Sequence, residues 1–439
     1  MSKSYDKIKK CFWIFFFFLL TEGIFRRWLL PEFNNMFLVI RDPFVIYAVV
    51  LGMRCGLFRS GVAKFIMGIG ILCFIFALTI GHGNLLVAIY GARITVFYFP
   101  FIYIVSRVLS RDDVLKIGKV LVLMIIPMVF LNIVQFFSPQ SSFVNIGVGG
   151  DEDGAGFGGA MGYFRPPGIF TFIAGLTDYY ACSLGFLLYF YFCPEDAARM
   201  KLSRWLIILS VCAYFISIPV SISRTHFVQT GFILVFFVIM AIRSGKSFSR
   251  VIMFALFVVI AIPLLFLNND TKLFIDVFME RFTGANESEG GLAKSAMERI
   301  FGWLFRAIDK APLFGFGDGY FSNVGMKILH GDTNAYTGAI KNVVDSTEME
   351  WGRIVCEDGV ILGILLIVAR IKIAYNVWRQ SLNALCRRCD YLSWLLMPMA
   401  AFSVCIYQCK APYNLGFMTL MIISVLVSLR TNNQQVISN

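Results

Sequence analysis

Charged side chains at helical spacing follow the long polar interval in the second half of the chain. Glu350, Arg353 and Glu357 stand at i, i+3 and i+7, so on a helix they form one stripe of an otherwise apolar segment. Lipid cannot accommodate ionised groups, and we therefore expect the stripe to face the protein interior or a water-filled cavity. A Glu-Arg-Glu network that fixes helix packing is the structural alternative. Glu348 lies further out, nearer to water, and is the better candidate for a general base.

A second set of such residues lies in the segment 297–320, which predicts an amphipathic helix followed by a Pro-Leu-Phe-Gly-Phe-Gly turn. Three basic residues and a tryptophan recur along one face, at Arg299, Trp303, Arg306 and Lys310. Apolar residues follow the same spacing half a turn away, at Met297, Phe301, Leu304 and Ile308. Such a helix can lie at the membrane surface, with its apolar side in lipid or protein and its arginines presented to an anionic head group. The alternative is a surface helix whose charges are merely solvated.

Further arginines and histidines stand where outer loops meet predicted spans. In the junction SISRTHFVQTG, Arg224 could hold a phosphate with two parallel hydrogen bonds, and His226 could shuttle a proton. A packed interfacial histidine is the alternative for His226. Arg165 precedes a rigid Pro-Pro turn, and Arg93 lies about two turns into the outer half of its span. His330, one of three histidines in the chain, is in the polar tail of the long interval.

The composition is that of a polytopic membrane protein. Hydrophobic residues make up 58% and charged residues 15% of the chain, and the mean hydropathy is +0.74; about 25% charged residues is typical of soluble domains. A helix needs roughly 17 to 25 apolar residues to cross a bilayer. About twelve such runs predict a single all-α membrane domain over residues 1–439, with both termini on one side. The runs lie near 12–30, 36–53, 65–80, 85–106, 117–137, 169–193, 205–221, 227–242, 251–267, 347–369, 391–409 and 412–429.

Lysines and arginines predict the orientation of these spans, because short cytoplasmic connections are enriched in both. Most of the 39 basic residues fall on the side of the N-terminus, which we take as cytoplasmic. Two long intervals then lie outside, the Gly-rich loop 138–168 and the large loop 268–346, which contains the predicted helix. The remaining outer basic residues are Arg26, Arg27, Arg41, Arg93, Arg165, Arg224, Arg353 and Lys410. Each needs a partner there, and snorkelling or a local ion pair such as Arg41 with Asp42 is the structural explanation.

The same composition disfavours several other functions. The formal net charge of +12 follows from topology and attraction to anionic lipid, and the sequence contains no basic soluble domain that could bind nucleic acid. The 11 cysteines lie mostly within or beside spans, which disfavours a disulfide scaffold. Asp151, Glu152 and Asp153 lack the alternating spacing of a calcium loop. We therefore expect no metal and no other cofactor.

Four motifs occur in the same order as in a known family. They are RPPGIF at 165–170, SISRT at 221–225, Arg299-x3-Trp303 followed by PLFGFGDGYF at 312–321, and Glu357-x-Gly359-x3-Gly363. On these motifs the chain resembles the O-antigen ligase and polymerase superfamily of bacterial cell envelopes, over about residues 90 to 370. The resemblance implies an inverting, metal-independent glycosyltransferase with a GT-C-like fold and a helical periplasmic loop. Such an enzyme acts on undecaprenyl-pyrophosphate-linked glycans at the periplasmic face of the inner membrane.

The resemblance also implies roles for individual residues. The arginines that would bind diphosphate or sugar are Arg165, Arg224 and Arg299, with weaker contributions from Arg93 and Arg306. Ligases commonly carry a histidine nine residues before the E-x-G glutamate, where this chain has Glu348, and His330 does not align with it. This departure favours the polymerase branch. We therefore expect a polymerase of O-antigen, capsule or exopolysaccharide repeat units, with membrane lipids and a chain-length regulator as further partners.

All candidates are expected to converge on one outward-facing cavity. The substrate-binding set there also includes His226, Glu350, Arg353, Glu357 and His330. The growing glycan would be the donor, arginines would stabilise its diphosphate leaving group, and Glu348 would deprotonate the attacking hydroxyl. An O-antigen ligase acting on lipid A-core is the alternative within this class. A lipid-linked oligosaccharide flippase is the alternative from another class, although a transporter should place ionisable residues near the membrane midplane on broken helices.

Overall fold

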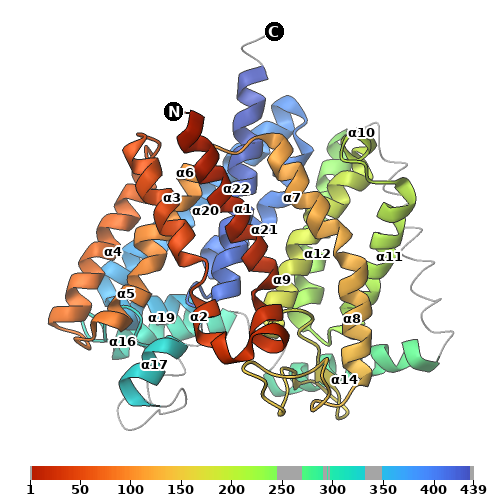
Figure 1. The fold of residues 1–439 in the computed structure, drawn as a ribbon, viewed down its shortest axis with the longest axis horizontal. Coiled ribbons are helices and arrows are strands. Elements are labelled where there is room, and N and C mark those ends of the chain that lie inside the picture. Colours follow the sequence, from red (N-terminus) through yellow and green to blue (C-terminus); the bar gives the residue numbers. More distant parts are fainter. Residues whose placement is uncertain (1, 245–268, 290–293, 295–296, 332–348, 436–439) are drawn as a thin grey trace.

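Helices account for almost all of the regular structure. The computed structural model describes residues 2–244, 269–289, 294, 297–331 and 349–435. Within these ranges the sheet structure is one short antiparallel hairpin, formed by β1 (Phe157–Gly158) and β2 (Phe164–Arg165). The described chain is therefore an all-α membrane protein, as its composition predicts (Figure 1).

The elements follow one another through short connections. The first half contains α1 (Ser2–Ile24), α2 (Asn34–Leu38), α3 (Asp42–Arg54), α4 (Gly61–Thr79), α5 (Leu85–Arg93), α6 (Phe99–Val105), α7 (Arg111–Leu123), α8 (Ile125–Phe137), α9 (Ile173–Phe192) and α10 (Pro194–Arg199). The second half contains α11 (Arg204–Val220), α12 (Arg224–Ser244), α14 (Asn269–Glu289), α16 (Trp303–Lys310), α17 (Asn323–His330), α19 (Glu350–Asp358), α20 (Val360–Arg388), α21 (Tyr391–Ile406) and α22 (Pro412–Gln435). Short π-helical or 3-10 turns adjoin some of them: η1 (Phe25–Leu29), η2 (Pro31–Phe33), η3 (Ile94–Tyr98) and η4 (Glu298–Gly302).

Eight described helical segments are long and apolar enough to cross a membrane. They are Pro31–Arg54, Gly61–Thr79, Leu85–Val105, Arg111–Phe137, Ile173–Phe192, Arg224–Ser244, Val360–Arg388 and Pro412–Arg430. All eight overlap predicted spans. Helices α1, α11 and α21 lie where three more were predicted, and the predicted span 251–267 lies outside the described residues. The total of twelve spans stays a prediction.

Two of these spans are enclosed by the others. In α9, 94% of the apolar window is buried, and in α22 83%, compared with 33% in α4. A span with protein on all sides can carry polar side chains that lipid would exclude. Accordingly, α9 carries the buried Asp178, whose hydrogen bonds with Tyr407 and Gln229 connect α9 to α12 and to the turn before α22.

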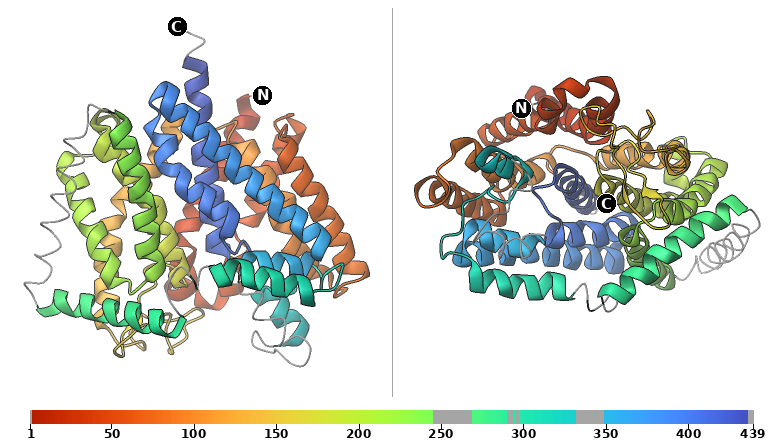
Figure 2. Two further views of the ribbon diagram at one scale, coloured as in Figure 1. Left: turned by 180° about the vertical axis from the view of Figure 1, so that it is seen from behind. Right: turned by 90° about the horizontal axis from the view of Figure 1, so that it is seen from below.

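The two termini lie at one end of the bundle, and both outer excursions lie at the other (Figure 1). We call this second end the outer end. It carries the Gly-rich loop with its hairpin, together with α14, α16 and α17 of the large loop. Helices α14 and α16 run across the ends of the spans instead of along them (Figure 2). This arrangement agrees with the predicted topology, in which the termini share one side and the two excursions share the other.

The span predicted near 347–369 is interrupted. Helix α19 ends at Asp358 and α20 begins at Val360, with Gly359 at φ +81° between them. A Cβ on Gly359 would lie 2.2 Å from the carbonyl oxygen of Leu313, so the outer loop packs directly against this break. The charged stripe predicted for this segment therefore lies on α19, a short helix separate from the membrane-spanning α20.

Candidate functional site

Most of the basic residues at the outer end are neutralised inside the fold. Arg93, predicted to bind substrate, lies 2.7 Å from Asp42 Oδ2, and its guanidinium lies 3.9 Å from the centre of the Tyr90 ring. Arg41 pairs with Glu22 at 3.1 Å, and not with Asp42 as suggested by the sequence. Both arginines are buried. Because Arg93 already has a buried carboxylate partner, its place in the structure is in helix packing.

Arg27 anchors the Gly-rich loop to the end of α1. Its guanidinium donates to the carbonyl oxygens of Ile146 at 2.8 Å, Gly168 at 2.8 Å and Phe170 at 3.0 Å. The five donors of a planar guanidinium suit such a set of carbonyl groups. The loop, including the Pro-Pro turn after Arg165, is thereby held against the membrane bundle.

Three arginines gather at the outer end. They are Arg165 on β2, Arg224 at the first residue of α12 and Arg281 on α14, and we call them the arginine cluster. The Nε of Arg165 is buried and has no hydrogen-bond partner. Burial, together with the positive charges of Arg281 and Arg224, lowers the pKa of Arg165. The neighbouring charges that act on Arg165 therefore have its own sign, as expected of a site that binds an anion.

A small hydrophobic cluster holds the three arginines together. It consists of Phe136, Val220, Ile222, Phe274 and Val277, with Tyr163 packed against it. Phe136 stacks on Tyr163 with ring centres 4.5 Å apart and meets Phe274 edge-on at 4.7 Å. The arginines follow members of this set closely in the chain: Arg165 after Tyr163, Arg224 after Ile222, and Arg281 after Val277. Packing of α8, the hairpin, α14 and the start of α12 thus brings the guanidinium groups to one place.

The junction that leads into Arg224 is strained. Ile222 has φ +48°, a left-handed conformation that is an outlier for a β-branched residue. Its side chain is buried in the hydrophobic cluster, and Ser223 caps α12 by accepting from the backbone N–H of His226 at 3.3 Å. Such strain persists where surrounding packing over-determines the backbone, and it concentrates at ligand-binding positions. Here it sets the start of α12, with Arg224 as the first residue.

His226 points into the bundle. Its ring is fully buried, Nε2 lies 2.9 Å from Ser217 Oγ, and the ring stacks on Tyr180 with centres 4.8 Å apart. Of the two alternatives for this residue, the structure agrees with the packed histidine. Its sequence proximity to Arg224 does not bring its ring to the arginine cluster.

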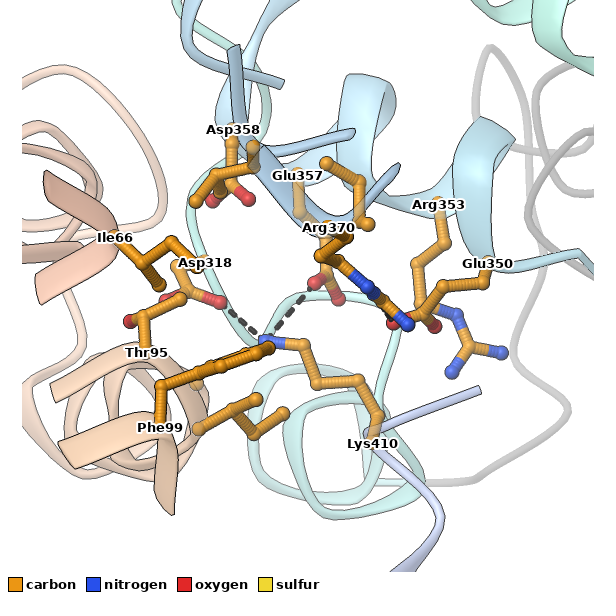
Figure 3. A pocket seen from close by; sticks show the side chains of 14 residues that line it. Ile66, Thr95, Phe99, Asp318, Glu350, Arg353, Glu357, Asp358, Arg370 and Lys410 are labelled. Atoms are coloured by element: carbon orange, nitrogen blue, oxygen red, sulfur yellow. Dashed lines mark hydrogen bonds and ion pairs between the residues drawn. The ribbon is translucent and has the colours of Figure 1, made fainter. Parts of the chain in front are cut away.

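The predicted carboxylates belong to a second set of contacts. Glu357 Oε1 accepts from the backbone N–H of Phe321 at 2.9 Å, and Oε2 lies 3.1 Å from Lys410 Nζ. Lys410 also binds Asp318 Oδ1, so one ammonium group serves two carboxylates (Figure 3). We call Asp318, Glu357 and Lys410 the Lys410 network. Glu357 and Asp318 are almost completely buried, and Glu357 therefore holds the fold together at this point.

The glycine-rich loop 312–321 carries Asp318 into this network. Gly317 and Gly319 have φ of +103° and +90°, which favour glycine. A Cβ on Gly319 would also lie 2.4 Å from the carbonyl oxygen of Val87 on α5. The PLFGFGDGYF motif is thus an insertion packed between α5 and the break at the end of α19.

His82 holds the same loop from the other side. Its Nδ1 accepts from the backbone N–H of Asn84 at 3.0 Å, and its Nε2 lies 3.2 Å from the carbonyl oxygen of Asp318, to which it must donate. A neutral ring with its hydrogen on Nε2 makes both bonds, whereas a protonated ring cannot accept from Asn84. Burial is the main cause that lowers the pKa of His82.

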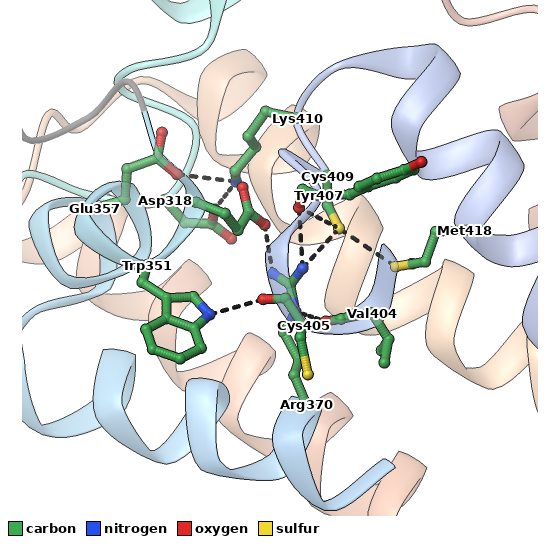
Figure 4. A network of polar contacts seen from close by, with 11 residues as sticks. Asp318, Trp351, Glu357, Arg370, Val404, Cys405, Tyr407, Cys409, Lys410 and Met418 are labelled. Carbon is green, nitrogen blue, oxygen red and sulfur yellow. Dashed lines mark hydrogen bonds and ion pairs between the residues drawn. The ribbon is translucent and has the colours of Figure 1, made fainter. Parts of the chain in front are cut away.

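Glu350 is neutralised by Arg370. The guanidinium of Arg370 binds Glu350 Oε1 and donates to the carbonyl oxygens of Val404 at 2.7 Å and Tyr407 at 3.0 Å (Figure 4). Both charged residues are buried. The predicted stripe does face the protein interior, but Glu350 and Glu357 are held by Arg370 and Lys410. The network that fixes packing, which was the structural alternative, describes these two residues.

A cavity of about 30 Å³ lies among these groups, lined by charged residues that include Asp318, Arg353, Glu357, Asp358 and Lys410. It has room for about two water molecules, and none for a sugar ring. Burial, reinforced by the charge of Asp318, raises the pKa of Asp358. Burial alone would lower the pKa of Lys410, but the three carboxylates raise it above its ordinary value.

The remaining candidates lie apart from both sets. Arg306 pairs with Glu298 at 3.0 Å, and both side chains are exposed to solvent. His330 Nε2 lies 2.9 Å from Tyr320 Oη at the end of α17. The side chain of Arg299 and the whole of Glu348 lie outside the described residues. Instead of one cavity, the described candidates thus form the arginine cluster and the Lys410 network, with single residues elsewhere.

Comparisons with known proteins do not assign a family: no model of a known protein family matches the chain, and no curated protein matches it. The resemblance to O-antigen ligases and polymerases therefore rests on the four motifs.

Sequence reasoning missed Arg281. The signal was the spacing of Phe274, Val277 and Arg281, which places an arginine on the apolar face of α14.

Proposed function

We propose that the protein polymerises undecaprenyl-pyrophosphate-linked polysaccharide repeat units, of O-antigen, capsule or exopolysaccharide, at the periplasmic face of the bacterial inner membrane. The observation that carries this proposal is the arginine cluster at the outer end of a multi-pass membrane protein. A lipid-linked diphosphate presents its charge where lipid meets water. Guanidinium groups match phosphate oxygens with paired hydrogen bonds, and three of them balance the charge of a diphosphate.

The reaction would be a metal-independent inverting transfer. The growing glycan is the donor, and a hydroxyl of the incoming unit attacks its anomeric carbon. As the new carbon–oxygen bond forms, the bond to the diphosphate breaks and its electron pair leaves with the diphosphate. Arginines stabilise this charge, and each such contact is worth about 2 to 4 kcal/mol in the transition state.

Glu348 takes the proton of the attacking hydroxyl in this proposal. An exposed glutamate has a pKa of about 4.3 and becomes an effective base when the substrate covers it. Replacement of Glu348 with glutamine should reduce turnover strongly and leave diphosphate binding intact. Unchanged turnover would exclude Glu348 as the base.

The proposal is tested by replacing Arg165 and Arg224 singly with alanine. Both variants should insert in the membrane and accumulate, but polymer formation should fall by roughly 30- to 1,000-fold, because each loses a charge-assisted diphosphate contact. Lysine at either position should restore little activity, since an ammonium lacks the paired donors of a guanidinium. The measurement is the chain length of glycan formed by reconstituted protein from purified lipid-linked units.

Arg306 supplies the matched control. It is an outer arginine of the predicted helix, but it is exposed and paired with Glu298. Arg306→Ala should therefore polymerise at close to the wild-type rate. Full activity in both Arg165→Ala and Arg224→Ala would contradict the proposal, as would equal losses in all three variants.

A deletion strain separates the polymerase from its alternatives. Without a polymerase, single repeat units should remain on the lipid carrier or reach lipid A-core without extension. Without a ligase, long chains would remain on the carrier. Without a flippase, lipid-linked units would stay at the cytoplasmic face. Carrier-bound long chains in the deletion strain would therefore replace polymerase with ligase as the function.

A further inference from the structure

We propose that α14 is an anion-coupled clamp: Arg281 supplies a third guanidinium to a phosphate-bearing ligand, and that ligand relieves the repulsion that opposes docking of α14 on the bundle. The identity of the ligand as a lipid diphosphate rests on the proposed function. The anion site and its coupling to α14 rest on the arrangement of α14 alone.

Helix α14 has two distinct faces. Phe274 and Val277 are buried in the hydrophobic cluster, and Arg281 follows Val277 by four residues on the same face. The two acidic residues nearby, Asp276 and Glu280, are exposed on the outward side. The helix therefore directs an arginine toward the bundle and turns its carboxylates away from it.

Aromatic contacts on both sides of Arg281 fix its position. Phe278 and Phe282 contact the ring of Phe227 with centres 5.9 and 5.8 Å apart. Phe227 lies three residues after Arg224 on the first turn of α12. Docking of α14 thus brings Arg281 to the helix start that carries Arg224 and next to the hairpin that carries Arg165.

This docking brings like charges together. Hydrophobic contacts hold α14 in place, while three guanidinium groups repel one another beneath it. An anion bound among them would remove that repulsion and stabilise the docked helix, because a ligand stabilises the state that binds it. An arginine that served packing alone would instead stabilise the protein in the absence of an anion.

The experiment compares thermal unfolding of the purified full-length protein, at low ionic strength, with and without inorganic pyrophosphate. Arg281→Gln removes the inward charge. Lys272→Gln is the matched control, because Lys272 is exposed on α14 and stands nine residues earlier, half a turn around the helix from Arg281. Phe274→Ala weakens the docking of α14 and leaves every charge in place. Inorganic sulfate tests whether any divalent anion suffices.

We expect pyrophosphate to raise the melting temperature of wild type and Lys272→Gln, and sulfate to raise it less. Without anion, Arg281→Gln should melt at or above the wild-type temperature, and its pyrophosphate affinity should fall by about 10- to 100-fold. Phe274→Ala should also bind pyrophosphate more weakly. The clamp is refuted if Arg281→Gln melts below wild type without anion, if it keeps the wild-type response, or if Phe274→Ala binds with unchanged affinity.

The outcome for the proposed function is separate. If wild-type protein binds pyrophosphate through Arg281 but extends no lipid-linked glycan, the polymerase proposal fails and the anion-coupled clamp stands. If the protein makes polymer and Arg281→Gln keeps the wild-type pyrophosphate response, the clamp fails and the polymerase proposal stands.

Discussion

Replacing Lys410 with methionine should destabilise the fold strongly, because two buried carboxylates share its ammonium group. Nζ lies 3.1 Å from Glu357 Oε2 and also binds Asp318 Oδ1. At an effective dielectric constant of about 20, the attraction across that distance is about 5 kcal/mol. Desolvation offsets much of this, and breaking a buried pair from one side costs about 3 to 5 kcal/mol. The ratio of folded to unfolded protein should fall by about 100-fold or more.

The assay is thermal unfolding of purified protein in detergent, followed by the loss of monodisperse protein. A second substitution apportions the effect: Asp318→Asn combined with Lys410→Met removes one of the stranded charges. The double variant should therefore be more stable than Lys410→Met alone, and the mutant cycle should give a coupling free energy of opposite sign to the two single losses. Additive losses would mean that the two groups do not interact.

The same variant should show a defined dependence on pH. Burial already raises the pKa of Glu357 above its ordinary value of 4.5, and loss of Lys410 should raise it further. A carboxyl whose pKa is raised in the folded state contributes its stability below the ordinary value, and this stability is lost as the pH rises through the folded value. Lys410→Met should thus be closest to wild type at acidic pH and furthest from it at alkaline pH. A wild-type melting temperature at alkaline pH would refute the reasoning.

Two further predictions concern the loop that carries the Lys410 network. Gly319→Ala should lower the melting temperature strongly, because a Cβ would lie 2.4 Å from the carbonyl oxygen of Val87 at φ +90°; Gly331→Ala, at φ +77° with open space around it, should cost only about 1 to 2 kcal/mol. Because the pKa of His82 is lowered, its contribution is present above its ordinary value of 6.5 and is lost as the pH falls below it. The wild-type protein should therefore lose more stability between about pH 7.5 and pH 5.5 than His82→Gln does, and equal losses would contradict the neutral-ring geometry.

The membrane-spanning helices were predictable because their signal is local. A run of apolar residues of bilayer length specifies a helix whatever packs around it, and the basic connections indicate which ends lie together. The break before α20 was not predicted, because it depends on contact between Gly359 and Leu313, which lie far apart in the sequence. Sequence spacing carries no information about such a contact.

The candidate site was predictable in part for the same reason. Counting basic residues on the outer side correctly singled out positions that need partners, but it could not find the partners. Asp318 is 92 residues from Lys410, and Asp42 is 51 residues from Arg93. Neighbouring residues in the sequence suggested the wrong pair for Arg41, since Asp42 serves Arg93 instead.

The two outer sets of charge differ in the balance that decides their chemistry. In the Lys410 network each described charge faces an opposite one, and such a closed set holds helices and loops together. Around Arg165 the neighbouring charges, Arg281 and Arg224, repeat its sign, and its Nε has no hydrogen-bond partner. A fold keeps like charges together when something outside the chain completes the set. The shortage of negative charge at the arginine cluster, more than the number of arginines, therefore points to the place where an anionic substrate binds.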